Sequence, residues 1–272
     1  MSGVPADHPA RARDRLIDRL RAAGCVFAED EADLLVDAAR DAVELESMAQ
    51  QRIGGLPLEQ VVGWAAFHGL RIEVDPGVFV PRRRTELLVD EALACLPRRE
   101  PQDPAPVVVD LCCGSGAVGA AVLDARGDVE LHAADVDPAA VRGAARNLAS
   151  TGGVVHRGDL FDALPARLRG RVRLVVANVP YVPSAEIELL PREARLHEPR
   201  AAVDGGGDGL DVLRRVADGV TTWLVPGGQL LVETSDHQSS AATASFEQAG
   251  MTVRLVTSED LGATVLIGTR PC

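Results

Sequence analysis

The 272-residue sequence contains no lysine, and only 3% of its residues are aromatic. Aliphatic side chains must therefore build most of the core, and we attribute the missing lysine to genomic base composition rather than to mechanism. The 40 acidic residues outnumber the 28 arginines, which gives a net charge of −12. This balance makes the chain a poor candidate for gripping a nucleic-acid backbone, because cationic contacts dominate that affinity.

Targeting signals and metal motifs are also lacking. No apolar run approaches membrane-spanning length, and the N-terminus does not have the basic-then-apolar layout of a secretory signal, so we expect a soluble cytoplasmic protein. The five cysteines form no Cys-x-x-Cys pair, and no histidine cluster completes a metal site. We interpret the adjacent Cys112 and Cys113 as small apolar residues after a buried strand.

Two segments with different periodicities organise the chain. Helical spacing runs from residue 9 to 52, followed by a predicted β-hairpin with strands at 67–74 and 78–80. A helix through Leu96 and a Pro-rich linker at 97–106 come next. Beyond them, strands are predicted at 107–111, 129–134, 153–156, 172–177, 228–233, 252–256 and 263–268, and helices at 116–126, 138–150, 185–190, 208–224 and 237–249. This alternation predicts an α/β fold with a doubly wound, mostly parallel sheet.

The loop after the first of these strands is rich in glycine. Residues 110–116 fit Asp-x-x-x-Gly-x-Gly, and glycines allow close approach of the backbone to a ligand. With Gly119, the loop also matches the dinucleotide pattern Gly-x-Gly-x-x-Gly, which leaves a NAD-binding oxidoreductase open. However, Asp110 would repel a pyrophosphate and would suit a cationic or zwitterionic ligand such as S-adenosylmethionine.

Acidic residues end the next two predicted strands. Asp135 can accept both hydroxyls of a ribose, and Asp137 is an alternative that can instead cap the following helix. Asp159 and Leu160 stand where an adenine would lie. The predicted cofactor-binding residues are therefore Asp110, Cys112, Gly114, Gly116, Asp135, Val136, Asp159 and Leu160, with Thr85 and Asn178 bordering the same pocket.

A second loop, Asn178-Val179-Pro180-Tyr181, closes the fourth strand of the sheet. It resembles the Asn-Pro-Pro-Tyr motif of methyltransferases that act on planar nitrogens, including adenine-N6 DNA enzymes and glutamine-N5 protein enzymes. The resemblance implies that the Asn178 side-chain oxygen and the Val179 carbonyl accept hydrogen bonds from the substrate nitrogen, while Tyr181 packs on its plane. Asn178, Val179, Pro180 and Tyr181 are therefore the predicted catalytic residues. Val179 replaces a proline, so the fixed φ of proline is lost while the backbone carbonyl remains.

Further blocks match the release-factor glutamine methyltransferases (the HemK/PrmC type). They lie at residues 55–63, 67–69, 80–86, 198–206, 209–211 and 225–233. The resemblance implies a class I methyltransferase-like seven-stranded sheet, with an N-terminal helical substrate-docking domain (1–65), a β-hairpin linker (66–84) and a methyltransferase domain (85–272). It also implies S-adenosylmethionine-dependent methylation of the N5 nitrogen of a protein glutamine, with the Gly-Gly-Gln loop of a class I release factor as the candidate acceptor.

Departures from the family pattern leave the substrate open. Besides Val179, Arg173 stands where the family usually has Asp, and residues 261–265 lack its usual Asp-Arg pair. A divergent branch that methylates another protein, such as a ribosomal protein, therefore remains an alternative. A nucleic-acid N-methyltransferase and a cofactor-binding module without activity are further alternatives.

Charged residues outside the two loops are harder to assign. Glu198 and Arg200 are predicted to shape the substrate mouth, with a structural ion pair as the competing interpretation. We interpret residues 82–84, three consecutive arginines, as a solvated face rather than a contact for an acidic partner. No sequence feature indicates the oligomeric state.

Overall fold

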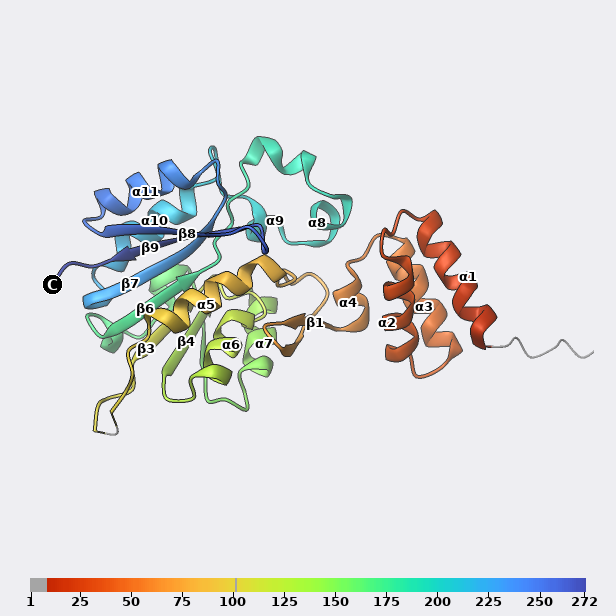
Figure 1. The fold of residues 1–272 in the computed structure, drawn as a ribbon, viewed down its shortest axis with the longest axis horizontal. Helices are drawn as coiled ribbons and strands as arrows, with labels where there is room; N and C mark the ends of the chain where they lie inside the picture. Colours follow the sequence, from red (N-terminus) through yellow and green to blue (C-terminus); the bar gives the residue numbers. More distant parts are fainter. Residues whose placement is uncertain (1–8, 101) are drawn as a thin grey trace, which may run out of the picture.

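The computed structural model describes residues 9–100 and 102–272 (Figure 1). The first eight residues of the predicted docking domain lie outside the described residues. The N-terminal part contains helices α1 (Pro9–Ala22), α2 (Ala28–Ala38), α3 (Ala42–Ile53) and α4 (Leu58–Val62), which follow the predicted helical spacing. No helix in the described ranges has both the length and the apolar character needed to cross a membrane.

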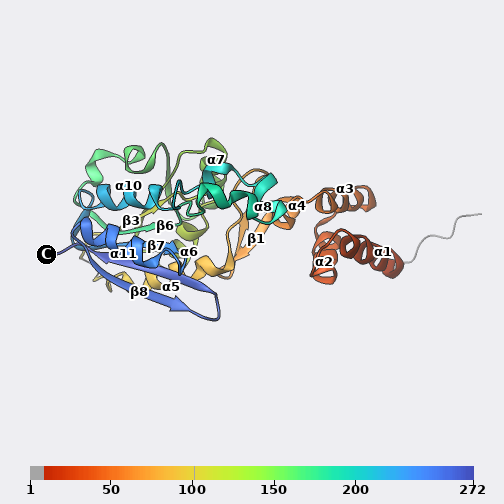
Figure 2. The ribbon, with the colours of Figure 1, turned by 90° about the horizontal axis from the view of Figure 1, so that it is seen from above.

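The three longer N-terminal helices pack around their own small core. Leu16 and Leu20 of α1 meet Leu35 of α2 and Met48 of α3, all with buried side chains. Asp41 begins α3 by accepting hydrogen bonds from the backbone N–H groups of the next turn. This bundle lies at one end of the long axis of the molecule, and the C-terminus lies at the other (Figures 1 and 2).

A β-hairpin forms in this region, but not with the predicted strands at 67–74 and 78–80. Its strands are β1 (Trp64–Phe67) and β2 (Leu70–Glu73), paired antiparallel. The turn is therefore at His68–Gly69, and both residues adopt positive φ. The predicted turn at 75–77 is a loop, and residues 78–80 are not a strand. The alternation over residues 67–74 predicted one continuous strand, and it does not indicate that His68 adopts the left-handed conformation that makes a turn there.

The second part holds a seven-stranded sheet. Its strands are β3 (Val107–Leu111), β4 (Glu130–Asp135), β5 (Val154–Arg157), β6 (Val172–Ala177), β7 (Leu224–Thr234), β8 (Thr252–Ser258) and β9 (Ala263–Thr269). The order is β5-β4-β3-β6-β7-β9-β8, with β9 antiparallel to both of its neighbours and the other pairings parallel. The predicted doubly wound, mostly parallel α/β sheet is confirmed.

Helices cover both faces of the sheet. One face packs against α5 (Glu86–Cys95), α6 (Ala117–Ala125) and α7 (Pro138–Asn147), and the other against α10 (Asp211–Val220) and α11 (Ser239–Gln248). Along β3, Val108 faces the first layer while Val107, Val109 and Leu111 face the second. Strands buried on both faces explain the continuous apolar runs in the sequence.

Short elements complete the chain. The helices α8 (Arg192–His197) and α9 (Arg200–Val203) were not predicted, and the predicted helix at 185–190 is a 3₁₀ helix, η4 (Ser184–Leu189). Further 3₁₀ helices are η1 (Arg83–Thr85), η2 (Leu160–Ala163) and η3 (Ala166–Leu168).

The order of the strands fixes where a ligand can bind. From β3, the chain winds outward through β4 and β5, then returns to place β6 on the other side of β3. Open α/β sheets bind ligands at such a switch point, outside the carboxyl ends of the strands. The two loops singled out in the sequence follow β3 and β6, so they meet at this point.

Candidate active site

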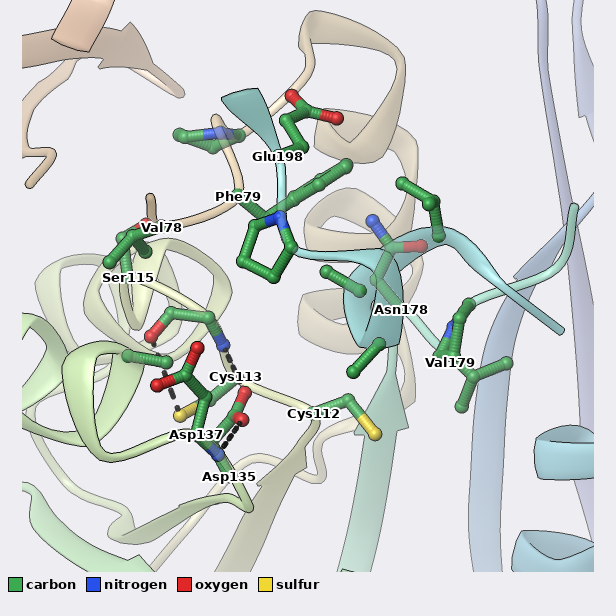
Figure 3. A pocket seen from close by; sticks show the side chains of 18 of the residues that line it. Val78, Phe79, Cys112, Cys113, Ser115, Asp135, Asp137, Asn178, Val179 and Glu198 are labelled. Atoms are coloured by element: carbon green, nitrogen blue, oxygen red, sulfur yellow. Dashed lines mark hydrogen bonds between the residues drawn. The ribbon is translucent and has the colours of Figure 1, made fainter. Parts of the chain in front are cut away.

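One cavity of about 440 Å³ lies at the carboxyl ends of β3, β4, β5 and β6 (Figure 3). Its lining comes from the loops after these strands and from residues within 78–85, 190–194 and 198–203, of which Arg200 is not one. The structure thus brings together most of the predicted site residues, namely Thr85, Asp110, Cys112, Gly114, Asp135, Val136, Asp159, Leu160, Asn178, Val179, Pro180, Tyr181 and Glu198.

Asp110 is buried beneath the glycine-rich loop. Its Oδ2 accepts a hydrogen bond of 2.9 Å from the backbone N–H of Gly119, in the first turn of α6. Burial is the main cause that raises the pKa of Asp110, to about 7. In a dinucleotide-binding fold, N–H groups at this helix start would face a pyrophosphate. Here an internal carboxylate occupies one of them, which argues against the NAD interpretation.

Two glycines of the Gly-x-Gly-x-x-Gly pattern, Gly116 and Gly119, allow close packing between elements. A Cβ at Gly119 would lie 2.8 Å from Leu131 Cδ2, so glycine allows α6 to pack closely on β4. Gly116 has φ +76°, and a Cβ there would lie 3.0 Å from Ala144 Cβ of α7. Gly116 does not line the cavity, unlike Gly114. Its predicted contact with a cofactor is therefore replaced by a contact between two helices.

The backbone around the cavity departs from ordinary conformations. Cys112 (φ 55°) and Leu160 (φ 48°) are two of the three non-glycine residues with positive φ in the described chain, and both line the cavity. Such strain persists only where surrounding structure holds it, and it concentrates at functional sites. Gly114 also has positive φ, with open space where a Cβ would be.

Asp135 is fixed by backbone donors from two loops. Its Oδ2 accepts from Gly114 N–H and its Oδ1 from Asp137 N–H, both at 2.9 Å. Each oxygen keeps a further lone pair for a ligand hydroxyl, and burial raises the pKa of Asp135. The Asp137 side chain accepts a hydrogen bond from Ala139 N–H, which confirms the prediction that it can cap the following helix, α7. Figure 3 shows Asp135 on one wall and Asn178 on another.

Asp159 lies at the rim of the cavity. Its Oδ2 accepts from Arg215 at 2.7 Å, and both side chains are about half exposed. The carboxylate lines the same cavity as Asp135, with part of its accepting capacity already used by Arg215.

The loop after β6 carries Asn178 and Tyr181. Asn178 Nδ2 lies 3.3 Å from Thr85 Oγ1. The Tyr181 hydroxyl accepts from Arg84, and burial is the main cause that raises the Tyr181 pKa. The Val179 side chain is buried in the core shared by the sheet, α10 and α11. Three side chains of the loop are thus in contact with the rest of the protein: Asn178 with Thr85, Tyr181 with Arg84, and Val179 with the core.

Two of the three consecutive arginines pair with buried carboxylates from distant parts of the chain. Arg82 pairs with the buried Glu198, and Arg84 Nε donates to the buried Glu233 at 2.9 Å. Burial raises the pKa of Glu198, which Arg82 opposes. The solvated-face interpretation missed both pairings, although Arg84 remains 44% exposed, because no local pattern indicates that residues 82 and 84 meet residues 198 and 233.

Arg200 does not line the cavity. Its Nε donates to Asp204 at 2.9 Å, and its side chain is 72% exposed. Glu198 therefore pairs with Arg82 rather than with Arg200, and of the two residues predicted to shape the substrate mouth only Glu198 reaches the cavity. Arg173, the residue that departs from the family pattern, lies on β6 with its Nε buried and without a hydrogen-bond partner in the described chain.

The sequence reading also missed the wall formed by residues 190–194. Arg52 at the end of α3 donates to Glu31 of α2 (2.6 Å) and to Glu193 of α8 (2.9 Å). Glu193 lines the cavity. One mostly buried guanidinium therefore ties the N-terminal helices to the cavity wall.

Comparison with known proteins agrees with this geometry. Residues 69–215 match the family model of the methyltransferase small domain. A release factor glutamine methyltransferase of Mycolicibacterium smegmatis is 38% identical over 218 residues, covering 79% of this chain and 75% of the relative. The chain belongs to the release factor glutamine methyltransferase family.

The chain is also similar to a methyltransferase named for a different substrate and to a solved methyltransferase structure. A 4-amino-L-phenylalanine/4-methylamino-L-phenylalanine methyltransferase of Streptomyces pristinaespiralis is 35% identical over 252 residues, covering 92% of this chain and 83% of the relative. The crystal structure of a methyltransferase from Pyrococcus furiosus matches with a TM-score of 0.56 at 15% identity, covering 84% of this chain and all of the other. At that identity the structural match supports the fold alone.

We expect Gly116→Ala to destabilise the protein more than Gly152→Ala does. Both glycines have positive φ, but only at Gly116 would the new methyl group meet another side chain. The added overlap with Ala144 should lower the free energy of unfolding by about 1–3 kcal/mol beyond the control. Denaturant titration of both variants measures this difference, and equal losses would contradict the packing role.

Asp110 should make the stability depend on pH. A carboxyl in the unfolded chain has a pKa of about 3.9, whereas Asp110 in the folded protein has a pKa of about 7. The folded state therefore keeps this proton between those values, so the stability from this group is full below about pH 4 and is lost as pH rises to about 7.

Asp110→Asn removes this dependence and keeps an acceptor for Gly119. The free energy of unfolding of the variant, relative to the parent, should therefore rise between pH 4 and 8 by a few kcal/mol, at roughly 1.4 kcal/mol per pKa unit. Denaturant titrations across this range measure it. Parallel curves for the two proteins would show that Asp110 titrates normally.

Proposed function

We propose that the protein transfers a methyl group from S-adenosylmethionine to the N5 nitrogen of a glutamine side chain in a protein, acting in the cytoplasm. The observation that carries this proposal is that the acidic loops after β3 and β4 and the Asn178–Tyr181 loop line the same cavity. Membership of the family agrees with it. The Gly-Gly-Gln loop of a class I release factor is the proposed acceptor.

The residues of the cavity fit the cofactor. Asp110 and Asp135 place carboxyl groups where a cationic or zwitterionic ligand can lie, and Gly114 leaves open space beside them. Asp135 retains lone pairs that can accept hydrogen bonds from ribose hydroxyls. Asp159 and Leu160 line the same cavity, and their proposed role is to contact the adenine. When bound, S-adenosylmethionine supplies an electrophilic methyl group.

The Asn178 loop supplies what an amide nucleophile needs. The lone pair of an amide nitrogen is delocalised into its carbonyl, so the nitrogen reacts poorly in water. Hydrogen bonds from its two N–H groups to Asn178 Oδ1 and the Val179 carbonyl would orient the lone pair, and Tyr181 would pack on the amide plane. The residues therefore accelerate the reaction by positioning and hydrogen bonding rather than by a strong base.

The division of the chain follows from the same proposal. Residues 1–65 dock the protein substrate, residues 66–84 form the linker, and residues 85–272 carry out methyl transfer. The contact of Arg52 with both Glu31 and Glu193 supports a docking domain that is held against the cavity wall. Glu198 also lines the cavity, and its proposed role is to contact the substrate.

Asn178→Ala should strongly slow methylation without abolishing cofactor binding. We expect the parent protein, incubated with S-adenosylmethionine and a class I release factor of the same host, to add one methyl group to the glutamine of the Gly-Gly-Gln loop. Loss of the accepting oxygen should slow the reaction by about 100-fold or more. Intact-mass and peptide mapping measure the product, and calorimetry measures cofactor binding. A parent protein that binds the cofactor but leaves this glutamine unmodified would overturn the acceptor assignment.

A free aromatic amine is the second candidate substrate. The relative from Streptomyces pristinaespiralis, named for methylation of 4-amino-L-phenylalanine, matches 92% of this chain, against 79% for the Mycolicibacterium smegmatis relative. An arylamine nitrogen, like an amide nitrogen, delocalises its lone pair, so the same two acceptors would orient it. The ion pairs at Glu193 and Glu198 provide charges that a free amino acid would need.

A direct competition distinguishes the two candidates. If the acceptor is a protein glutamine, free 4-amino-L-phenylalanine should gain no methyl group under conditions in which the release factor is fully modified. Mass spectrometry of the small-molecule fraction measures this. A methylated arylamine together with an unmodified release factor would favour the second candidate and exclude the first.

A further inference from the structure

A buried carboxylate lies behind the cavity without lining it. Glu233, near the end of β7, is 3% exposed, and its two oxygens have different partners. Oε1 accepts from Arg84 Nε at 2.9 Å, and Oε2 accepts from the Thr85 hydroxyl at 2.6 Å. Burying a charge is costly unless it is paired. Both partners line the cavity, so the pairing of Glu233 faces the site.

The hydrogen bond from the Thr85 hydroxyl to Glu233 Oε2 determines what Thr85 can offer to Asn178. A hydroxyl has one proton, and a carboxylate can only accept. Once Thr85 donates to Glu233, it presents only lone pairs to its other neighbour, Asn178, at 3.3 Å. The group of Asn178 that faces Thr85 must then be the NH₂, which directs Oδ1 away from Thr85. The chain of donors thus selects one of the two orientations of the Asn178 amide.

The other oxygen, Oε1, acts on Tyr181 through Arg84. The guanidinium only donates, and it donates to both Glu233 Oε1 and the Tyr181 hydroxyl. Its central carbon also lies 5.6 Å from the centre of the Tyr181 ring. With Arg84 held by Glu233, the phenol has a fixed donor at its oxygen. One carboxylate therefore reaches two residues of the β6 loop by separate routes.

We propose that Glu233 is a positioning residue that orients the Asn178 amide through Thr85 and the Tyr181 ring through Arg84. The catalytic part of this inference rests on the proposed transfer to an amide nitrogen, in which Asn178 must present its oxygen to the substrate. The structural part does not depend on the substrate.

Glu233→Gln tests the catalytic part with little change in shape. The new amide can donate to Thr85, which frees the Thr85 proton for Asn178 Oδ1 and permits the reversed orientation. We expect kcat with the release factor to fall by about 10- to 100-fold, while the Kd for S-adenosylmethionine stays within about twofold. Glu91→Gln is the matched control, because Glu91 also pairs with an arginine, Arg254, at 3.0 Å, and neither residue lines the cavity. It should leave kcat unchanged.

The hydroxyl of Thr85 gives a second test of the same route. Thr85→Val keeps the volume and removes the hydroxyl, so it should lower kcat as Glu233→Gln does. Thr85→Ser restores the hydroxyl and should turn over at least about tenfold faster than Thr85→Val. Equal rates for the two Thr85 variants would contradict a role through hydrogen bonding.

Tyr181 gives a readout that needs no substrate, because it is the only tyrosine in the chain. The ultraviolet absorbance of tyrosinate therefore reports its titration alone. Burial and the charge of Glu233 raise the pKa of Tyr181, while Arg84 and Arg82 lower it. Glu233→Gln should therefore lower this pKa, and Glu91→Gln should not, with circular dichroism confirming that each variant stays folded over the titration.

The two readouts separate the possible failures. A Glu233→Gln variant with unchanged kcat and unchanged Tyr181 titration would overturn the inference. If the parent protein does not methylate glutamine, the proposed function fails. The Tyr181 titration still tests the structural part: a lowered pKa in Glu233→Gln supports it, and an unchanged pKa contradicts it. Should Glu233→Gln not fold, Thr85→Val and Arg84→Met each break one route, and wild-type kcat in both would overturn the inference.

Discussion

The parallel pairing of β3 with β6 is the constraint on which the site depends. The register aligns Leu111 with Ala177, the last residues of the two strands, so the loops that follow them leave the sheet side by side. Because β4 pairs on the other side of β3, Asp135 also ends at this edge. A shift of either strand by one residue would exchange its two buried faces. The same apolar packing that stabilises the sheet therefore sets the relative positions of the glycine-rich loop after β3 and the Asn178–Tyr181 loop after β6.

Local pattern was sufficient for most of the sheet and for the residues at the strand ends. Apolar runs and the residues that end them are properties of short segments, and parallel topology then brings strand ends together. The failures have the same physical origin. The hairpin turn at His68–Gly69 requires a non-glycine residue at positive φ, which the local pattern does not indicate. The partners of Arg82 and Arg84 lie more than 100 residues away, and no periodicity encodes such a pairing.

Gly116 and Arg200 show the limit of motif reading. Gly116 was assigned to the site as part of the Asp-x-x-x-Gly-x-Gly loop, and Arg200 as a charged residue within a block that matches the family. In the structure, Gly116 allows α7 to approach the start of α6, and Arg200 pairs with Asp204 at the surface. Motifs combine residues that contact a ligand with residues that shape the loop, and only the three-dimensional contacts separate them.

Val179 in place of proline changes what restricts the conformation of the β6 loop, but the backbone carbonyl of residue 179 remains. Proline would restrict this loop through its own φ. Here the restriction comes from contacts: the Val179 side chain is buried in the core, and Gln238 Nε2 donates to the Tyr181 carbonyl at 2.8 Å. Val182 exchanges backbone hydrogen bonds with Val203 and Gly205 on the far side. Because these contacts hold the loop on both sides of Pro180, the backbone carbonyl of residue 179 can keep its direction without the proline ring.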